Sequence, residues 1–148
     1  MSLAIKELDS SQRAELVELF LEIFTGAPWY DVWEDPDRPA LYLEELTGSP
    51  NSLSLGLYDG SRLIGISLGR ILHFAFGTQY CIDEFGIRPD RQGQGAGREF
   101  LRQIENFARA RKIDFLFLMT DRGFPSESFY RKNGFRELER NICLFKKL

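Results

Sequence analysis

A glycine-rich segment, Arg91–Gly97, is the part of the sequence most directly suited to chemistry. It lies between an apolar stretch typical of a strand, Tyr80–Ile87, and a segment with apolar residues at helical spacing. Glycine lets the backbone turn tightly and approach a ligand without a Cβ in the way. The first N–H groups of the following helix have no partner within the helix, and its dipole adds partial positive charge there. A phosphate or pyrophosphate group is therefore the ligand that this segment favours over a merely flexible turn.

Two common phosphate-binding patterns do not fit this segment. A phosphate-loop NTPase requires glycine, four residues and then Gly-Lys-Ser/Thr, whereas an arginine and a glutamate follow Gly97. The dinucleotide pattern G-x-G-x-x-G fails because neither Gly93 nor Gly95 has a glycine in the third position. A third pattern, Gln/Arg-x-x-Gly-x-Gly/Ala, is present as Gln92–Gly97.

Candidate proton-transfer groups flank the glycine segment. Asp83 and Glu84 are adjacent on the preceding strand, so regular alternation predicts that only one of them faces a substrate, unless a bulge at Gly86 reverses the pattern. Tyr130 lies in a short helix that ends before Gly134. The alternative interpretations are that the other acid simply lies on the sheet surface and that Tyr130 is an aromatic residue of the core.

Aromatic and charged residues are unevenly distributed. Trp29, Tyr30 and Trp33 lie in an acidic loop, where they either line a cation-binding site or anchor the loop on the core. Residues 26–50 carry six acids and one base, whereas residues 88–112 carry seven bases and three acids. This asymmetry indicates either two solvated faces or an anionic ligand at one end and a cationic substrate at the other.

Composition restricts the class of protein. With 148 residues, 43% of them hydrophobic and 28% charged, we expect one globular domain over residues 1–148. No apolar run approaches the roughly 18 residues of a membrane helix, and the N-terminal residues lack a signal-peptide pattern. The net charge of −3 disfavours a nucleic-acid partner. Cys81 and Cys143 lie in apolar runs, which predicts buried, reduced thiols in a cytoplasmic protein.

Two residues with possible reactivity, His73 and Cys81, receive a structural interpretation. His73, the one histidine, follows a predicted strand and is interpreted as structural or at the surface. Cys81 has no base near it in sequence, which disfavours an acyl-cysteine intermediate. No spacing typical of a metal site is present, so no metal is expected.

Hydrophobic periodicity predicts a fold of class α/β with a mixed (α+β) sheet, in the order β-α-α-β-β-β-α-β-α-β. The strand–helix–strand unit from Tyr80 to Met119 predicts a parallel, right-handed crossover, whereas the hairpin at Asp59-Gly60 makes the earlier strands antiparallel. Helices should cover both faces of the sheet. The apolar run Ile113–Met119 predicts a strand buried on both faces, and Phe135–Phe145 a final strand.

Three stretches together resemble the GNAT superfamily of acetyl-CoA-dependent N-acetyltransferases. They are an acidic lead-in ending in proline, Asp83–Asp90; the glycine pattern, Gln92–Gly97; and Phe129–Phe135, which is similar to the family's Phe/Leu-Tyr-x-x-x-Gly-Phe. The strand order agrees, and the resemblance covers essentially the whole chain. Gln92 stands where the family more often has arginine, which leaves a neutral donor near the phosphates.

The resemblance implies roles for these residues. Asp83, which matches the family's more frequent acidic position, or Glu84 would be the general base, and Tyr130 the acid that protonates the departing thiolate. Backbone groups of Phe85, Gly86 and Ile87 would contact the pantetheine arm of acetyl-CoA. Its pyrophosphate would be held by Gln92, Gly93, Gln94, Gly95, Ala96, Gly97 and Arg98.

The sequence therefore predicts an N-acetyltransferase acting on a primary amine of a small-molecule or peptidic, cationic acceptor by direct transfer in a ternary complex. The aromatic loop is similar to that of some small-molecule enzymes of the superfamily, including aminoglycoside-type ones. The alternative is a module of the same fold that binds acyl-CoA without turnover. No nucleic acid or membrane partner is expected, and the resemblance leaves a homodimer open.

Overall fold

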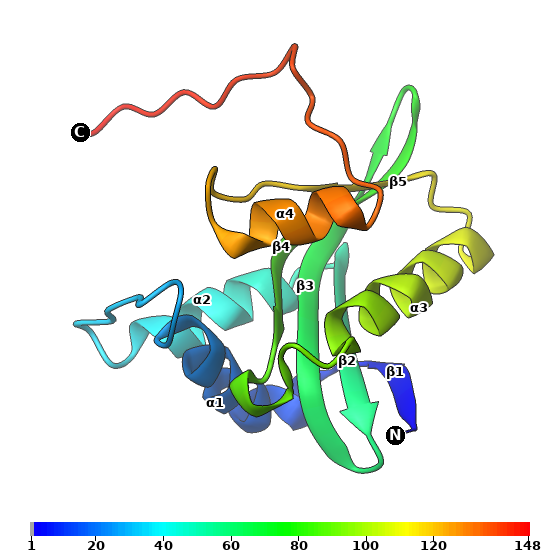
Figure 1. The fold of residues 1–148 in the computed structure, drawn as a ribbon. Helices are drawn as coiled ribbons and strands as arrows, with labels where there is room; N and C mark the ends of the chain where they lie inside the picture. Colours follow the sequence, from blue (N-terminus) through cyan, green and yellow to red (C-terminus); the bar gives the residue numbers. More distant parts are fainter. Residues whose placement is uncertain (1) are drawn as a thin grey trace.

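The computed structural model describes residues 2–148 (Figure 1). Five strands and four helices follow one another in the order β1, α1, α2, β2, β3, β4, α3, β5 and α4. Their bounds are β1 Leu3–Glu7, α1 Arg13–Phe24, α2 Arg38–Thr47, β2 Ser52–Asp59, β3 Arg62–Phe74, β4 Gly77–Ile87, α3 Ala96–Ala110, β5 Phe115–Leu118 and α4 Pro125–Lys132. The first helix is preceded by a 3-10 turn whose N-cap, Asp9, accepts a hydrogen bond from the Ser11 amide at 2.8 Å.

The strands form one sheet in the order β1-β2-β3-β4-β5. The pairs from β1 to β4 are antiparallel, whereas β4 and β5 are parallel. Both orientations agree with the sequence prediction, because hairpins connect the earlier strands and α3 crosses between the last two.

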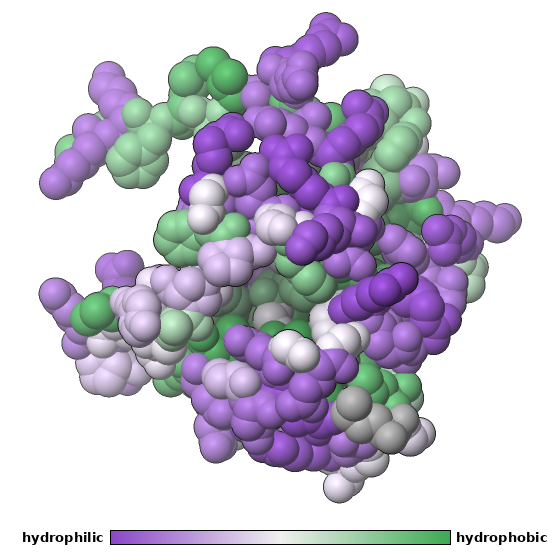
Figure 2. Space-filling view, in the orientation of Figure 1, coloured by the Kyte–Doolittle hydropathy of each residue, from purple (hydrophilic) through white to green (hydrophobic). Residues whose placement is uncertain are grey.

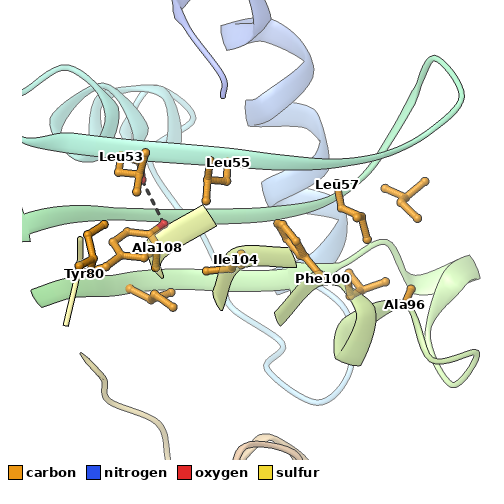
Figure 3. Close-up of a cluster of buried hydrophobic side chains, with 12 residues drawn as sticks. Leu53, Leu55, Leu57, Tyr80, Ala96, Phe100, Ile104 and Ala108 are labelled. Carbon is orange, nitrogen blue, oxygen red and sulfur yellow. Dashed lines mark hydrogen bonds between the residues drawn. The ribbon is translucent and has the colours of Figure 1, made fainter. Parts of the chain in front are cut away.

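Two hydrophobic clusters cover the two faces of the sheet. On one face α3 packs its apolar side, including Phe100 and Ile104, against β2 and β4 (Figure 3). Tyr80 is fully buried in this cluster, and its hydroxyl donates to the Leu53 carbonyl at 3.1 Å (Figure 3). On the other face α1 and α2 pack against β3, with Phe20 and Leu43 among the buried residues. The sheet therefore lies between helical layers, as predicted.

Three predictions about the C-terminal part are wrong. Residues 135–145 form no strand, and Cys143 is exposed, whereas Cys81 is buried as expected. The run Ile113–Met119 is not buried on both faces, because β5 is the last strand of the sheet and Phe115 is 45% exposed. Among the described residues no strand pairs with the outer edge of β5, so its apolar side chains remain partly uncovered.

No helix of the described chain has the length and apolar character to cross a lipid bilayer.

Candidate active site

The glycine segment turns the chain sharply between β4 and α3. Gly93 and Gly95 have φ values of +71° and +82°, which residues with a Cβ rarely adopt. A Cβ at either position would meet nothing within 4 Å, so the backbone faces open space. No side chain caps the N-terminus of α3. Its first amides are therefore available to an anionic group, as the sequence predicts.

Side chains of the glycine segment mostly hold the segment itself. The Gln92 side-chain amide donates to the Ile87 carbonyl at 2.9 Å, and that of Gln94 donates to the Asp90 carbonyl at 3.3 Å. Arg98 is exposed. Arg102, one turn further along α3, pairs with Glu99 at 2.6 Å, which agrees with a solvated helix face.

The second half of β4 has a free backbone edge. Pairing between β4 and β5 ends at Ile82 and Leu118, and no described strand pairs with residues 83–87 on that side. The two parallel strands therefore separate where the chain approaches the glycine segment (Figure 1). In the same orientation, Figure 2 shows a hollow with apolar residues on its floor, over β4 and beside α4. Backbone groups of Phe85–Ile87 can bind an extended ligand along this edge.

A bulge in β4 determines where the two acids lie. Leu68 of β3 pairs with Glu84, but the next residue of β3 pairs with Ile82, so Asp83 has no partner. Tyr80 and Ile82 belong to the core beneath α3, and so do Phe85 and Ile87. Regular alternation, by which only one of the adjacent acids faces the site, is therefore interrupted at Asp83 rather than at Gly86.

Glu84 is half-buried and hydrogen-bonded to α2. The Tyr42 hydroxyl donates to Glu84 Oε1 at 2.7 Å. Burial is the main reason that the pKa of Glu84 rises to about 7, and the charges of Asp31 and Asp83 raise it further, whereas the Tyr42 hydrogen bond opposes the rise. A carboxyl group with this pKa is partly ionised at neutral pH and can accept a proton.

Asp83 is in a different environment. One carboxylate oxygen lies 3.4 Å from Arg70 Nε, in an ion pair that is partly exposed to solvent. Arg70 also approaches the Cys81 sulfur, 3.8 Å from its Nη2. Burial raises the pKa of the Cys81 thiol, which favours its unreactive, protonated form. Of the two acids, Glu84 is thus the one that is hydrogen-bonded to a tyrosine and more deeply buried, and Asp83 is the one paired with an arginine.

Tyr130 lies on α4 within an aromatic cluster. Its ring contacts those of Phe85, Phe129 and Phe135, with centroids 6.1, 5.3 and 5.4 Å away. Burial raises the pKa of Tyr130, and the charge of Glu84 raises it further. Its hydroxyl has no hydrogen bond to the part of the chain that the structure describes. The hydroxyl therefore remains protonated at neutral pH and is available as a donor.

The three aromatic residues of the acidic loop occupy different positions. Trp33 packs against Tyr42, and its indole N–H is the one buried side-chain polar group without a partner among the described residues. Trp29 stacks on Phe124 with a centroid distance of 5.0 Å. Tyr30 is 66% exposed. Loop anchoring explains Trp29, whereas Trp33 belongs to the surroundings of Glu84.

Sequence reasoning named Glu84 and Tyr130 as candidates but did not consider Tyr42. No local pattern distinguishes this tyrosine within a short amphipathic helix, because its role depends on a hydrogen bond to a residue 42 positions away. His73 is exposed near the far end of β3, away from these groups. Among residues 2–148 no group of three His, Cys, Asp or Glu side chains is arranged to hold a metal ion.

Comparison with known proteins agrees with this geometry. The model of the Acetyltransferase (GNAT) family matches residues 13–135. The N-alpha-acetyltransferase RimI of Mycobacterium tuberculosis (strain ATCC 25618 / H37Rv) is 30% identical over 138 residues, covering 90% of this chain and 78% of RimI.

Solved structures share the fold at low sequence identity. An aminoglycoside acetyltransferase from an uncultured soil metagenomic sample, in complex with sisomicin, has a TM-score of 0.78 at 16% identity, covering 99% of this chain and 96% of its own. The structure of AAC(6')-Iy with a bisubstrate analogue, CoA-S-monomethyl-acetylneamine, has a TM-score of 0.74 at 16% identity, with all of both chains covered. With the family match over most of its length and a RimI relative at 30% identity, this chain belongs to the GNAT family of acetyltransferases.

Proposed function

We propose that the protein transfers the acetyl group of acetyl-CoA to a primary amine of a small-molecule or peptidic acceptor, by direct attack within a ternary complex. One observation carries this proposal: Glu84, with a pKa of about 7, is held by Tyr42 beside the free edge of β4 and within electrostatic range of Tyr130. One relative is named as an N-alpha-acetyltransferase and one structural neighbour as an aminoglycoside acetyltransferase, and both names support an amine acceptor.

The glycine segment would bind the pyrophosphate of the cosubstrate. The open space at Gly93 and Gly95 fits such a group, because backbone amides approach it without a Cβ between them. Amides of Gln94, Ala96, Gly97 and Arg98 would complete the cradle. The free edge of β4 at Phe85–Ile87 would hold the pantetheine arm by backbone hydrogen bonds.

Glu84 would remove the proton that blocks the reaction. A primary amine has a pKa near 10 and is mostly protonated at neutral pH, so it must lose a proton before it can attack. The Glu84 carboxylate accepts that proton, directly or through a water molecule, while Tyr42 holds its orientation. The amine then forms a C–N bond to the thioester carbonyl carbon, whose oxygen accepts hydrogen bonds from the β4 amides.

Tyr130 would act at the end of the reaction. When the C–S bond breaks, the electron pair leaves on the sulfur of CoA, and the Tyr130 hydroxyl donates its proton to that thiolate. The new amide nitrogen loses its remaining extra proton, which returns to the Tyr130 oxygen and restores the hydroxyl. The raised pKa of Tyr130 keeps this proton in place until the sulfur becomes basic. None of these steps uses a metal ion.

The acceptor is proposed to be cationic. Asp31 and Asp83 both influence the charge state of Glu84, so three acids lie near the site. Trp33 and Tyr42 add aromatic surface beside them. An ammonium group would be attracted to these carboxylates and to the ring faces.

A panel of amines tests the proposal against the alternative, a module that binds acyl-CoA without turnover. We expect CoA release with at least one class among polyamines, aminoglycosides, amino acids and peptides with free N-termini. Cationic acceptors should be preferred, and their KM should rise with added salt because exposed charges are screened. Acetyl-CoA binding without release of CoA in any reaction would favour the non-catalytic module. A preference for neutral or anionic amines would show that the uneven charge distribution only keeps two faces of the protein solvated and does not select the acceptor.

Substitution Gly95→Val should abolish CoA binding. A valine would occupy the space assigned to the pyrophosphate and would disfavour the positive φ of this residue. Gly60→Val is the matched control, because Gly60 has a φ of +60° and the same open surroundings in the β2–β3 hairpin. Calorimetry on the folded variants measures the difference. Unchanged affinity in Gly95→Val would remove this segment from the binding site.

Activity should depend on the ionisation of Glu84. The carboxylate is the active form, so kcat/KM, which reports the free enzyme, should rise with pH through about 7 and then level. Glu84→Gln should lower kcat by roughly 10²–10⁴-fold across this range.

Substitutions at two neighbours of Glu84 should shift the rising limb of the pH profile, the range in which activity increases with pH, in opposite directions. Tyr42→Phe removes a hydrogen bond that stabilises the carboxylate, so the limb should shift to higher pH. Asp83→Asn removes a negative charge that raises the pKa of Glu84, so its limb should shift to lower pH, with kcat at high pH retained. If Asp83→Asn instead abolishes turnover and Glu84→Gln retains it, Asp83 is the base.

Substitution Tyr130→Phe should lower kcat by about 10²-fold and leave acetyl-CoA affinity nearly unchanged. The hydroxyl is required when the thiolate forms, whereas the ring packing with Phe85 and Phe135 is retained. Melting temperature and kcat should be measured on the same variant. A variant with full turnover would make Tyr130 a packing residue and assign thiolate protonation to water or another group.

A further inference from the structure

Two ion pairs join the β2–β3 hairpin to the turn that precedes the glycine segment. Asp59 and Arg62 face each other across the hairpin, and Asp90 and Arg91 are neighbours in the turn after β4. Arg91 Nη1 lies 2.9 Å from Asp59 Oδ2, and Arg62 Nη2 lies 2.7 Å from Asp90 Oδ2. An acid and a base on the hairpin thus meet a base and an acid on the turn, and we call these two pairs the hairpin brace.

The two pairs together fix the turn more firmly than either pair alone. A single exposed ion pair contributes little, because water screens it and two long side chains must be ordered. The Arg91 side chain, however, is only 13% exposed, so its attraction to Asp59 is screened less than that of a surface pair. One pair allows the turn to rotate about it, whereas a second pair at the neighbouring residue opposes that rotation.

Arg88 fixes the beginning of the same turn. Its backbone amide donates to the Ile64 carbonyl at 2.7 Å, and its guanidinium donates to the Leu63 carbonyl at 3.0 Å. The guanidinium also pairs with Glu22 of α1 at 2.6 Å. The segment between Arg88 and Arg91 is therefore attached to β3, to α1 and to the hairpin.

The glycine segment is held from the turn rather than by packing around its glycines. The Gln94 side chain donates to the Asp90 carbonyl at 3.3 Å, so Asp90 accepts from Arg62 through its carboxylate and from Gln94 through its backbone. A Cβ on Gly93 or Gly95 would meet nothing within 4 Å, which leaves that side of the segment without a packing contact. A shift of the turn would therefore move the amides that face the open space.

We propose that Asp59 and Arg62 are positioning residues for the cosubstrate: through Arg91 and Asp90, they hold the glycine segment in the conformation that binds the pyrophosphate of acetyl-CoA. This inference rests on the proposed function, in which that segment binds the pyrophosphate. The two hairpin side chains would act through the turn and not by touching acetyl-CoA. They would raise the fraction of unliganded protein whose glycine segment is already in the binding conformation, and the apparent affinity is proportional to that fraction.

Removal of the hairpin acid separates positioning from simple electrostatics. Asp59→Ala deletes a negative charge near an anion-binding segment, so charge alone predicts tighter binding of CoA. Loss of the brace predicts the opposite, because a fall of the binding-competent fraction to about a tenth weakens binding about 10-fold. Calorimetry with CoA measures the dissociation constant. The KM for acetyl-CoA should rise in parallel, while kcat at saturating acetyl-CoA and the melting temperature stay near the wild-type values. A destabilised variant with unchanged CoA affinity would mean a merely structural role and overturn the proposal.

The second pair offers a matched control and a rescue. Arg62→Gln should weaken CoA binding by a similar factor, whereas Arg109→Gln, which also removes one cation and one exposed ion pair but lies in the last turn of α3, should leave it unchanged. Gly60 adds no side chain to either pair, so Gly60→Val keeps both pairs and stays a control as well. Exchange of the two charges, Arg62→Asp with Asp90→Arg, restores the pair and should recover most of the affinity lost in Arg62→Asp alone. An exchanged variant as weak as Arg62→Asp would contradict the brace.

Spectra of the unliganded protein distinguish a failure of this inference from a failure of the proposed function. In ¹⁵N-labelled protein the amide shifts of Gly93 and Gly95 should change in Asp59→Ala and in Arg62→Gln but not in Arg109→Gln. Unchanged shifts and unchanged CoA affinity, with CoA binding abolished in Gly95→Val, would overturn the brace and leave the proposed function intact. Shifts that change in a protein whose wild type binds no CoA would instead overturn the proposed function, and with it the role of the brace toward acetyl-CoA.

Discussion

Asp83 is an additional residue in β4 with no partner on β3, and the geometry of the candidate site depends on this bulge. Where it occurs, β3 and β4 approach closely: a Cβ on Gly69 would lie 2.0 Å from the Cys81 carbonyl oxygen. The bulge reverses the alternation of β4, so that Glu84 meets Tyr42 of α2 while Phe85 enters the core beneath α3. One inserted residue thus places the polar side chain of Glu84 on the α2 side of the sheet and the apolar side chain of Phe85 on the α3 side.

Phe85 connects the remaining parts of the site. Its ring lies 5.2 Å from that of Phe100 in α3 and 6.1 Å from those of Phe129 and Tyr130 in α4. Gly97 allows the ring of Phe129 to pack against the start of α3, because a Cβ there would come within 3.1 Å of it. The glycine segment, the free edge of β4 and the Tyr130 hydroxyl are therefore held in fixed relation by one aromatic cluster. Glu84 lies on the other side of β4, against Tyr42, and its burial there raises its pKa.

Features encoded by local sequence could be predicted. The glycine segment, the hairpin at Asp59-Gly60 and the β4–α3–β5 crossover depend on glycine spacing, turn chemistry and periodicity within short windows. The position of the bulge could not be predicted from local sequence, because it depends on how closely β3 can approach β4 at Gly69. Tyr42 was missed for the same kind of reason, since its partner lies in a distant segment. The strand expected at residues 135–145 depends on which edge is available to it, which no local pattern specifies.

As the proposed base, Glu84 needs a carboxyl pKa matched to proton transfer at neutral pH. NMR titration of the ¹³C-labelled glutamate side chains, with Glu84→Gln used to assign the Glu84 signal, measures this pKa directly. A midpoint near pH 7 agrees with the value of about 7 that burial and the neighbouring acids produce. A midpoint near the ordinary glutamate value of about 4.3 would contradict it, because Glu84 would then be a solvated carboxylate with little tendency to accept a proton.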